Sequence, residues 1–161
     1  MKKKILYIYL TILFLFLIFY MGIFLAPYLY DIDRLYSLFI YGIYSPICHQ
    51  IPERSFYIFN HKMTVCARCF GIYTGILFGM LIYPIVWGLN NFKTPNRWYL
   101  IVALIPMGID GITQLIGLRE SFNELRFITG FLGGFVTLFY ILPMFISVAY
   151  GLLRDENKIK S

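Results

Sequence analysis

The chain has 161 residues, of which 60% are hydrophobic and 14% are charged, whereas an ordinary soluble domain carries about 25% charged residues. This composition excludes a disordered chain and a soluble enzyme. The mean hydropathy is +0.72, and several apolar stretches are long enough to match the hydrocarbon layer of a bilayer, which is about 30 Å thick. We therefore expect an all-α integral membrane protein that forms a single transmembrane domain over residues 1–161.

Four apolar segments predict four transmembrane helices, at about residues 5–26, 70–89, 98–117 and 127–153. The first segment follows three lysines and is expected to end before Pro27, since proline suits a chain that leaves a helix. Its apolar core is too long for the h-region of a signal peptide, and no small-x-small cleavage site follows it. We therefore expect a retained anchor.

The long polar connection at residues 28–65 separates the first two spans. Within it, residues 35–44 are apolar and rich in tyrosine but too short to cross a bilayer. Tyrosine is enriched at membrane surfaces, so these residues predict an interfacial or re-entrant segment.

The distribution of Lys and Arg predicts the orientation in a cell membrane. Eight of these residues fall on the side that carries both termini and six on the other side, so the positive-inside rule favours cytoplasmic N- and C-termini. The net charge of +6 is explained by this asymmetry, and no basic helix or RNA-binding motif indicates a nucleic-acid partner.

Gly71, Gly75 and Gly79 recur every four residues along the second span. They form one ridge on which another helix can approach closely, the small-xxx-small pattern of helix packing in lipid. The ridge predicts close helix packing, either within the chain or in a homo-oligomer.

All three cysteines and both histidines fall between Cys48 and Cys69. Cys66 and Cys69 form a C-x-x-C pair, whose sulfur atoms share one face of a helical turn. Soft thiolates together with imidazole suit a tetrahedral zinc site. The predicted metal ligands are Cys48, His49, Cys66 and Cys69. Further candidates for the fourth position are His61 and Glu53.

Two other interpretations of these cysteines stay open. At a helix N-terminus beside Arg68, Cys66 and Cys69 would have lowered pKa values and would suit a thiol-disulfide couple, with Cys48 as the resolving thiol and a quinone as electron partner. Alternatively, the three thiols are inert. The odd number of cysteines argues against a purely structural disulfide.

Two polar residues interrupt the third span. Asp110 lies twelve residues into it, about 18 Å from the cytoplasmic boundary, and an ionised carboxylate at that depth is costly unless it is paired. Gln114 follows one turn later on the same face. We expect both to be catalytic, with Asp110 as the acid or base.

Four arginines gather at the same end of the predicted bundle. They are Arg54, Arg68, Arg119 and Arg126. Guanidinium groups bind phosphate or carboxylate in a bidentate manner, so these residues predict a site for an anionic substrate. The competing interpretation is that they form salt bridges with nearby carboxylates. Those carboxylates are Glu53, Asp110, Glu120 and Glu124.

The motifs together resemble a domain-of-unknown-function family of small multi-pass membrane proteins. The resemblance rests on Cys48-His49-Gln50, Arg54-Ser55-Phe56, Cys66-Ala67-Arg68-Cys69, Gly71-Ile72-Tyr73 with Gly75, and polar positions that run from Asp110 through Asn123 to Gly130. It covers roughly half of the chain, from residue 48 to residue 130. It implies a multi-pass membrane protein that carries these polar positions, and it brings no established reaction.

The leading functional hypothesis is a zinc-dependent membrane enzyme that acts on a lipid headgroup or a lipid-linked phosphate. Three thiolates plus one imidazole would fill a tetrahedral site, and closed sites are usually structural. Catalysis therefore requires that one of the four predicted ligands does not bind the metal. The alternatives are the thiol-disulfide protein and a non-enzymatic, metal-stapled scaffold or transporter subunit.

Overall fold

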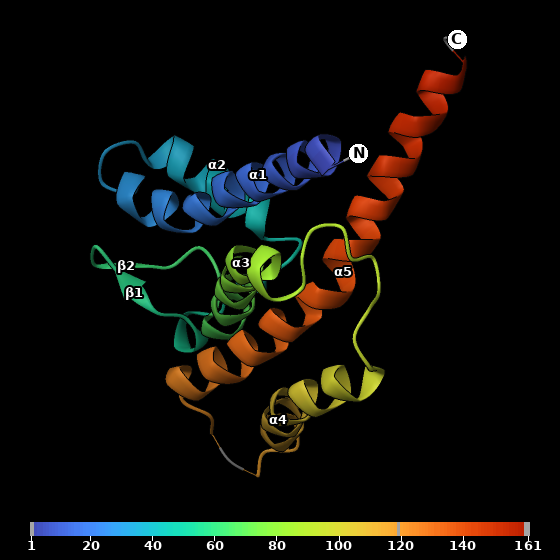
Figure 1. Cartoon of the computed structure of the whole chain (residues 1–161). Helices are drawn as coiled ribbons and strands as arrows, with labels where there is room; N and C mark the ends of the chain where they lie inside the picture. Colours follow the sequence, from blue (N-terminus) through green and yellow to red (C-terminus); the bar gives the residue numbers. More distant parts are fainter. Residues whose placement is uncertain (1, 119, 160–161) are drawn as a thin grey trace.

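The computed structural model describes the backbone of residues 2–118 and 120–159, and the side chains of residues 3–118 and 120–152 (Figure 1). In chain order the elements are α1 (Lys2–Leu29), α2 (Arg34–Tyr44), a 3-10 turn η1 (Pro52–Arg54), β1 (Tyr57–Ile58), β2 (His61–Lys62), α3 (Ala67–Val86), α4 (Arg97–Leu115) and α5 (Asn123–Ile159). The two short strands pair antiparallel.

In the described part of the chain, four helices are long and apolar enough to cross a membrane. They cover Lys3–Leu29, Ala67–Val86, Arg97–Leu115 and Asn123–Leu152, which confirms the all-α fold with four predicted spans. α3 and α4 end slightly earlier than predicted because Gly88 and Gly117 follow them with φ angles of +76° and +71°, a left-handed backbone that glycine adopts without steric cost.

α3 and α5 pack backbone to backbone at the centre of the molecule (Figure 1). A Cβ atom added at Gly71 or Gly75 would collide with a backbone carbonyl oxygen of α5. From the other side, a Cβ atom at Gly130 or Gly134 would collide with a carbonyl oxygen of α3. The predicted glycine ridge is therefore a packing surface that α5 of the same chain covers, and a homo-oligomer through this ridge would have to displace α5.

We predict that Gly75→Ala destabilises the protein, by about 1–3 kcal/mol, because its new methyl group meets backbone atoms of α5 that cannot rotate away. The matched control is Gly108→Ala, since a Cβ atom at Gly108 of α4 has no atom within 4 Å and alanine improves helix propensity. Thermal unfolding of the detergent-solubilised protein measures both. Equal midpoints for the two variants would contradict the account of α3–α5 packing.

α2 folds back along α1, and the two helices are joined by hydrogen bonds to carbonyl oxygens of α1. The Ser37 hydroxyl donates to Ala26 O at 2.7 Å, and the Tyr44 hydroxyl donates to Phe19 O. Asp33 caps the N-terminus of α2 by accepting from two backbone amides. A helix therefore occupies the segment expected to be interfacial or re-entrant, and its depth in the bilayer stays a prediction.

The first span continues past Pro27, contrary to the expectation that it ends there. α1 runs to Leu29 with Pro27 inside its last turns. Proline has no amide hydrogen, so the carbonyl of Ile23 lacks its helical donor. The buried Thr64 hydroxyl donates to that oxygen at 2.7 Å, and this contact ties the connection before α3 to α1.

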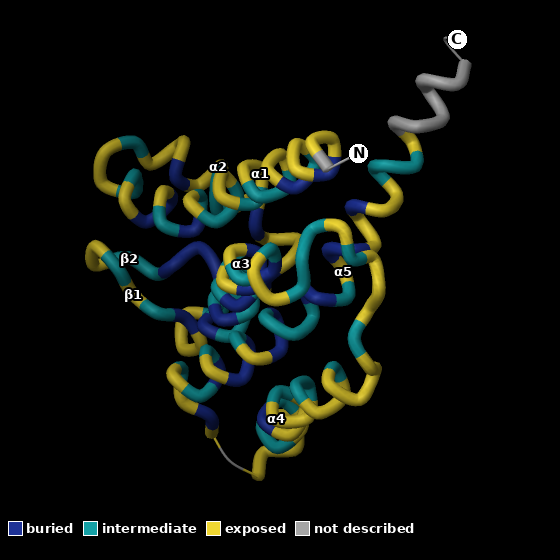
Figure 2. The backbone as a smooth tube through the Cα atoms, viewed as in Figure 1, coloured by how far each residue is buried: buried dark blue, intermediate teal, exposed yellow. Residues whose placement is uncertain are grey.

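α4 is the most exposed of the four long helices (Figure 2). It lies on the opposite side of the α3–α5 pair from α1 and α2 (Figure 1). Within Arg97–Leu115, Asp110 is the one fully buried residue. The polar end of α4 is thus the part that reaches the protein interior, and it leads directly to the candidate site.

Candidate metal and anion site

The three cysteines come together where the long connection meets α3. Cys48 follows α2, Cys66 is the N-cap of α3 and Cys69 lies in the first turn of α3. Their Sγ atoms all lie within 4.8 Å of one another, and all three thiols are free. This arrangement is able to hold a metal ion.

The loop after Cys48 is fixed by polar contacts with α2 and β2. Gln50 adopts a left-handed backbone with φ of +53°. Its side-chain amide donates to Tyr41 O at 2.8 Å, and the Lys62 ammonium donates to Gln50 O at 2.6 Å. These contacts bring Cys48 to the N-terminus of α3, where the Cys66 amide donates to Cys48 Sγ at 3.1 Å.

The pKa values of Cys48 and Cys66 are shifted in opposite directions within the cluster. Hydrogen bonds from the thiols of Cys66 and Cys69, helped by the backbone amides of Cys66 and Gln50, lower the pKa of Cys48 well below its usual value, against the opposing effect of burial. The same hydrogen bond to Cys48 raises the pKa of Cys66. One thiolate is therefore favoured in the cluster before any metal binds.

The structure separates the other predicted ligands from the thiols. Among the described residues, the group of mutually close ligand atoms comprises three cysteines, and His49 does not belong to it, although His49 lines the adjoining cavity. His61 instead pairs with Asp31, Nε2 to Oδ2 at 2.9 Å, and stacks on Tyr30. The exposed Glu53 lines a neighbouring cavity.

A cavity of about 330 Å³ adjoins the thiols. Its lining consists of Ile47, Cys48, His49, Gln50, Ile51, Arg54, Cys66, Arg68, Cys69, Ile72, Gln114 and Arg126. Three of the four predicted substrate-binding arginines thus face the same space as the three thiols, and no carboxylate of the described residues belongs to this lining. The fourth, Arg119, lies outside the described residues.

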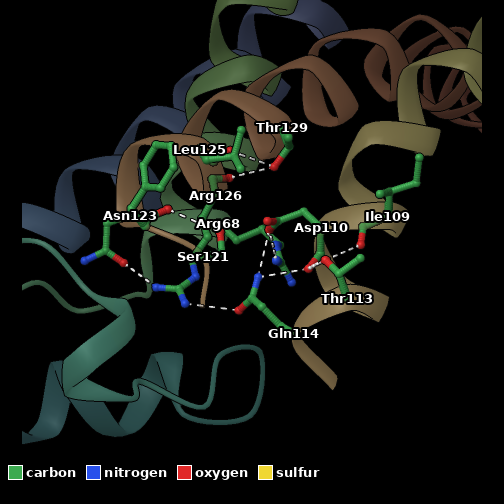
Figure 3. Close-up of polar contacts among 11 residues, drawn as sticks. Arg68, Ile109, Asp110, Thr113, Gln114, Ser121, Asn123, Leu125, Arg126 and Thr129 are labelled. Atoms are coloured by element: carbon green, nitrogen blue, oxygen red, sulfur yellow. Dashed lines mark hydrogen bonds and ion pairs between the residues drawn. The ribbon is translucent and has the colours of Figure 1, made fainter. Parts of the chain in front are cut away.

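A chain of hydrogen bonds connects the arginines across three helices (Figure 3). The Arg68 Nη2 atom donates to Asp110 Oδ2 at 2.5 Å, and Gln114 Nε2 donates to the same oxygen at 3.0 Å. Gln114 Oε1 accepts from Arg126 Nη2 at 3.0 Å. Arg126 Nη1 then donates to Asn123 Oδ1 at 2.7 Å. Asp110 thus links α4 to α3, Gln114 links α4 to α5, and the hydrogen bond between these two residues joins the three helices in one network.

Asp110 supports the cavity wall without being part of it. The residue is 1% exposed and contacts Arg68 and Gln114, both of which line the cavity. A carboxylate that is engaged by a guanidinium and an amide is poorly suited to exchange protons with a substrate. The geometry therefore favours a positioning role over the acid or base role that we expected.

Among the described arginines of the site, the interpretation as a salt bridge with a carboxylate is correct for Arg68. Among the described residues, the ion pairs are those of Arg68 with Asp110 and of His61 with Asp31. Arg54 and Arg126 thus remain without an ion-paired carboxylate in the described part of the chain, although Arg126 is 8% exposed.

Residues 48–140 match a family described as a predicted membrane protein, DUF2085. The chain belongs to this family. It is 62% identical over 148 residues to an uncharacterized protein of Methanocaldococcus jannaschii, covering 88% of this chain and 95% of that relative. It is 42% identical over 92 residues to an uncharacterized protein of Methanothermobacter thermautotrophicus, covering 55% of this chain and 78% of the relative.

No solved structure matches the chain. The family expected from the motifs is confirmed, and the names of its members bring no reaction. The matched residues 48–140 contain the thiol cluster and the described members of the arginine network, so the candidate site lies in the part of the chain by which the family is recognised.

Sequence reasoning missed the residues that hold the site in place. Asn123 belonged to the recognised polar positions, but nothing gave it a role; it contacts Arg126 and donates to Ser55 O at 3.2 Å. Likewise, nothing in the sequence indicated that Gln50 fixes the loop after Cys48. Its left-handed backbone, a conformation that is uncommon outside glycine, was not detectable from its residue type.

We predict that Asp110→Asn destabilises the protein by about 1–3 kcal/mol, because it breaks the ion pair between this buried carboxylate and the half-buried Arg68 and loosens α4. The matched control is Asp31→Asn, whose carboxylate is 75% exposed and pairs with His61 at the surface; its effect is expected to stay below about 1 kcal/mol. Thermal unfolding midpoints in detergent measure both variants. A neutral Asp110→Asn would contradict the positioning role.

Proposed function

We propose that this chain is a metal-dependent membrane enzyme that acts on a lipid or lipid-linked phosphate, with zinc bound by Cys48, Cys66 and Cys69. The observation that carries the proposal is the single cavity that both the thiol cluster and three arginines line. A metal at the thiols would polarise an oxygen of the substrate as a Lewis acid, while the guanidinium groups bind the anionic oxygens.

The thiol spacing supports a metal of the zinc type. Zinc–thiolate bonds of about 2.3 Å in a tetrahedron place neighbouring sulfur atoms about 3.8 Å apart. The Sγ atoms of this cluster lie within 4.8 Å of one another, so small side-chain rotations suffice to close on an ion. Thiolate ligands favour zinc over hard cations such as magnesium or calcium.

The position of His49 supports a catalytic site over a closed one. Catalytic zinc has three protein ligands and leaves the fourth position to water or substrate, whereas structural zinc has four protein ligands. His49 lines the cavity outside the thiol group. We propose that the fourth position opens to the cavity. If His49 were the fourth ligand, the zinc would have four protein ligands and no position for a substrate.

The cell membrane, with both termini in the cytoplasm, is the location that the charge asymmetry supports. In this orientation the site lies at the extracytoplasmic end of the bundle, where it would meet lipid headgroups. Within the site, we assign substrate binding to Arg54, Arg68 and Arg126. Asp110 and Gln114 hold two of these guanidinium groups in place.

A second candidate function is thiol-disulfide exchange, which the free and adjacent thiols of Cys66 and Cys69 favour. Oxidation would form their S–S bond and release two electrons and two protons to a quinone, and an external thiol reductant would reverse the step. Both candidate functions use the same sulfur atoms, so metal content decides between them.

We predict that the protein, purified in detergent under reducing conditions, contains about one zinc ion per chain. Single Cys→Ser substitutions at positions 48, 66 and 69 are expected to lose it, because two thiolates bind zinc far more weakly than three. His61→Gln is the matched control and is expected to keep the metal, since His61 pairs with Asp31. Metal analysis by mass spectrometry measures all variants.

His49→Gln separates an open from a closed site. Retention of zinc supports the open fourth position, and loss of zinc would contradict the enzyme and favour a metal-stapled scaffold. Zinc-free wild-type protein in which Cys66 and Cys69 form a reversible disulfide would contradict the metal centre and support the redox function.

A further inference from the structure

Three guanidinium groups converge on the cavity from three separate elements. Arg54 belongs to η1, Arg68 to the first turn of α3, and Arg126 to the first turns of α5. The charges of Arg54 and Arg68 repel that of Arg126. Among the described residues, these three positive charges and the negative charge of Asp110, which contacts Arg68, sum to +2.

Two neighbouring glutamates do not neutralise this positive charge through ion pairs with the arginines in the described part of the chain. Glu53 and Glu120 line a neighbouring cavity that shares Arg54 and Arg126 with the first. Neither forms an ion pair with an arginine in the described part of the chain. A divalent metal held by three thiolates carries one net negative charge, so the lining would keep a net charge of +1 in the metal-bound protein.

Two N–H groups of these arginines have no acceptor in the described part of the chain. The Nε atoms of Arg68 and Arg126 are buried without a hydrogen-bond partner among the described residues. Arg126 is the more deeply buried of the two, with 8% of its surface exposed. A buried donor without an acceptor destabilises a protein, and an anion is the ligand that would satisfy such donors.

The guanidinium groups of the buried Arg126 and the half-buried Arg68 are also held in fixed positions. Asn123 and Gln114 accept from the two Nη atoms of Arg126, and Asp110 accepts from Arg68. Their positions are therefore set before a ligand arrives, which lowers the entropic cost of binding. Arg54 is exposed, and its side chain forms no hydrogen bond or ion pair with the described residues, so it is the arginine of the three that is free to close on a ligand.

We propose that this cavity binds a phosphate dianion, either as free phosphate or as the phosphomonoester headgroup of a lipid. A phosphomonoester carries about −1.5 to −2 charges at neutral pH and three acceptor oxygens, which match the net positive charge of the cavity and its three converging guanidinium groups. A carboxylate offers one charge and two oxygens in a plane. The proposal rests on the proposed function for the identity of the substrate, but the arginine network that carries it needs no metal.

Arg54→Gln is the informative variant because it removes one charge from the cavity without breaking a hydrogen bond among the described residues. Arg34→Gln is the matched control, since Arg34 lies over the Tyr30 ring at the start of α2 and outside the cavity. Arg126→Lys is a second variant, which keeps the charge and removes the planar, two-pronged donor geometry.

The experiment measures the concentration-dependent rise in unfolding temperature with inorganic phosphate in detergent, and with phosphatidic acid in phosphatidylcholine nanodiscs. Acetate and pure phosphatidylcholine are the reference ligands. We expect phosphate or phosphatidic acid to stabilise the wild type and Arg34→Gln alike, and Arg54→Gln and Arg126→Lys to bind about tenfold more weakly or worse.

The two ligand arms identify the source of the phosphate. Stabilisation by phosphatidic acid alone assigns the site to a lipid headgroup, and stabilisation by inorganic phosphate assigns it to a soluble ligand; either result supports the proposal. No stabilisation by either ligand, equal stabilisation by acetate, or equal losses in Arg54→Gln and Arg34→Gln would overturn it.

The same measurement on Cys66→Ser separates this inference from the metal centre. Phosphate binding that persists in this variant would show that the anion site does not require the complete thiol cluster. A wild-type protein that contains zinc but does not bind phosphate would contradict the anion site and support the metal centre. A wild-type protein that lacks zinc but binds phosphate would contradict the metal centre and support the anion site.

Discussion

Direct backbone contact between α3 and α5 is the constraint on which the site depends. In a bilayer, apolar side chains gain little by leaving lipid, so helices associate through close packing and polar contacts. Glycines on both helices remove the side chains that would hold them apart, and at Gly130 the missing Cβ atom faces the carbonyl of Arg68 itself. The contact therefore fixes the register that sets Arg68 and Cys69 of α3 beside Arg126 of α5.

α4 is held to this central pair in a different way. Much of its surface is exposed. The buried Asp110 of α4 forms an ion pair with Arg68 of α3, and Gln114, one turn later, accepts a hydrogen bond from Arg126 of α5. Polar contacts of this kind are costly to leave unmade in a membrane. The residues that attach α4 are the same ones that orient the guanidinium groups, so helix packing and the proposed anion recognition share one network.

The sequence was sufficient to predict features that depend on local composition and period. Apolar length predicted four spans, the four-residue glycine repeat predicted a packing ridge, and the clustering of cysteines indicated that they meet. It was insufficient where the outcome depends on partners from distant segments. His61 pairs with Asp31 because the β1–β2 hairpin carries it toward the α1–α2 turn, and Pro27 stays helical because Thr64 supplies the missing donor.

Zinc-edge X-ray absorption of the purified protein, recorded with and without phosphate, tests most directly whether the thiols and the arginines serve one cavity. The account predicts three sulfur neighbours at about 2.3 Å and one lighter ligand whose signal changes when phosphate is added. A shell of four protein ligands that phosphate leaves unchanged, or the absence of sulfur neighbours, would contradict it.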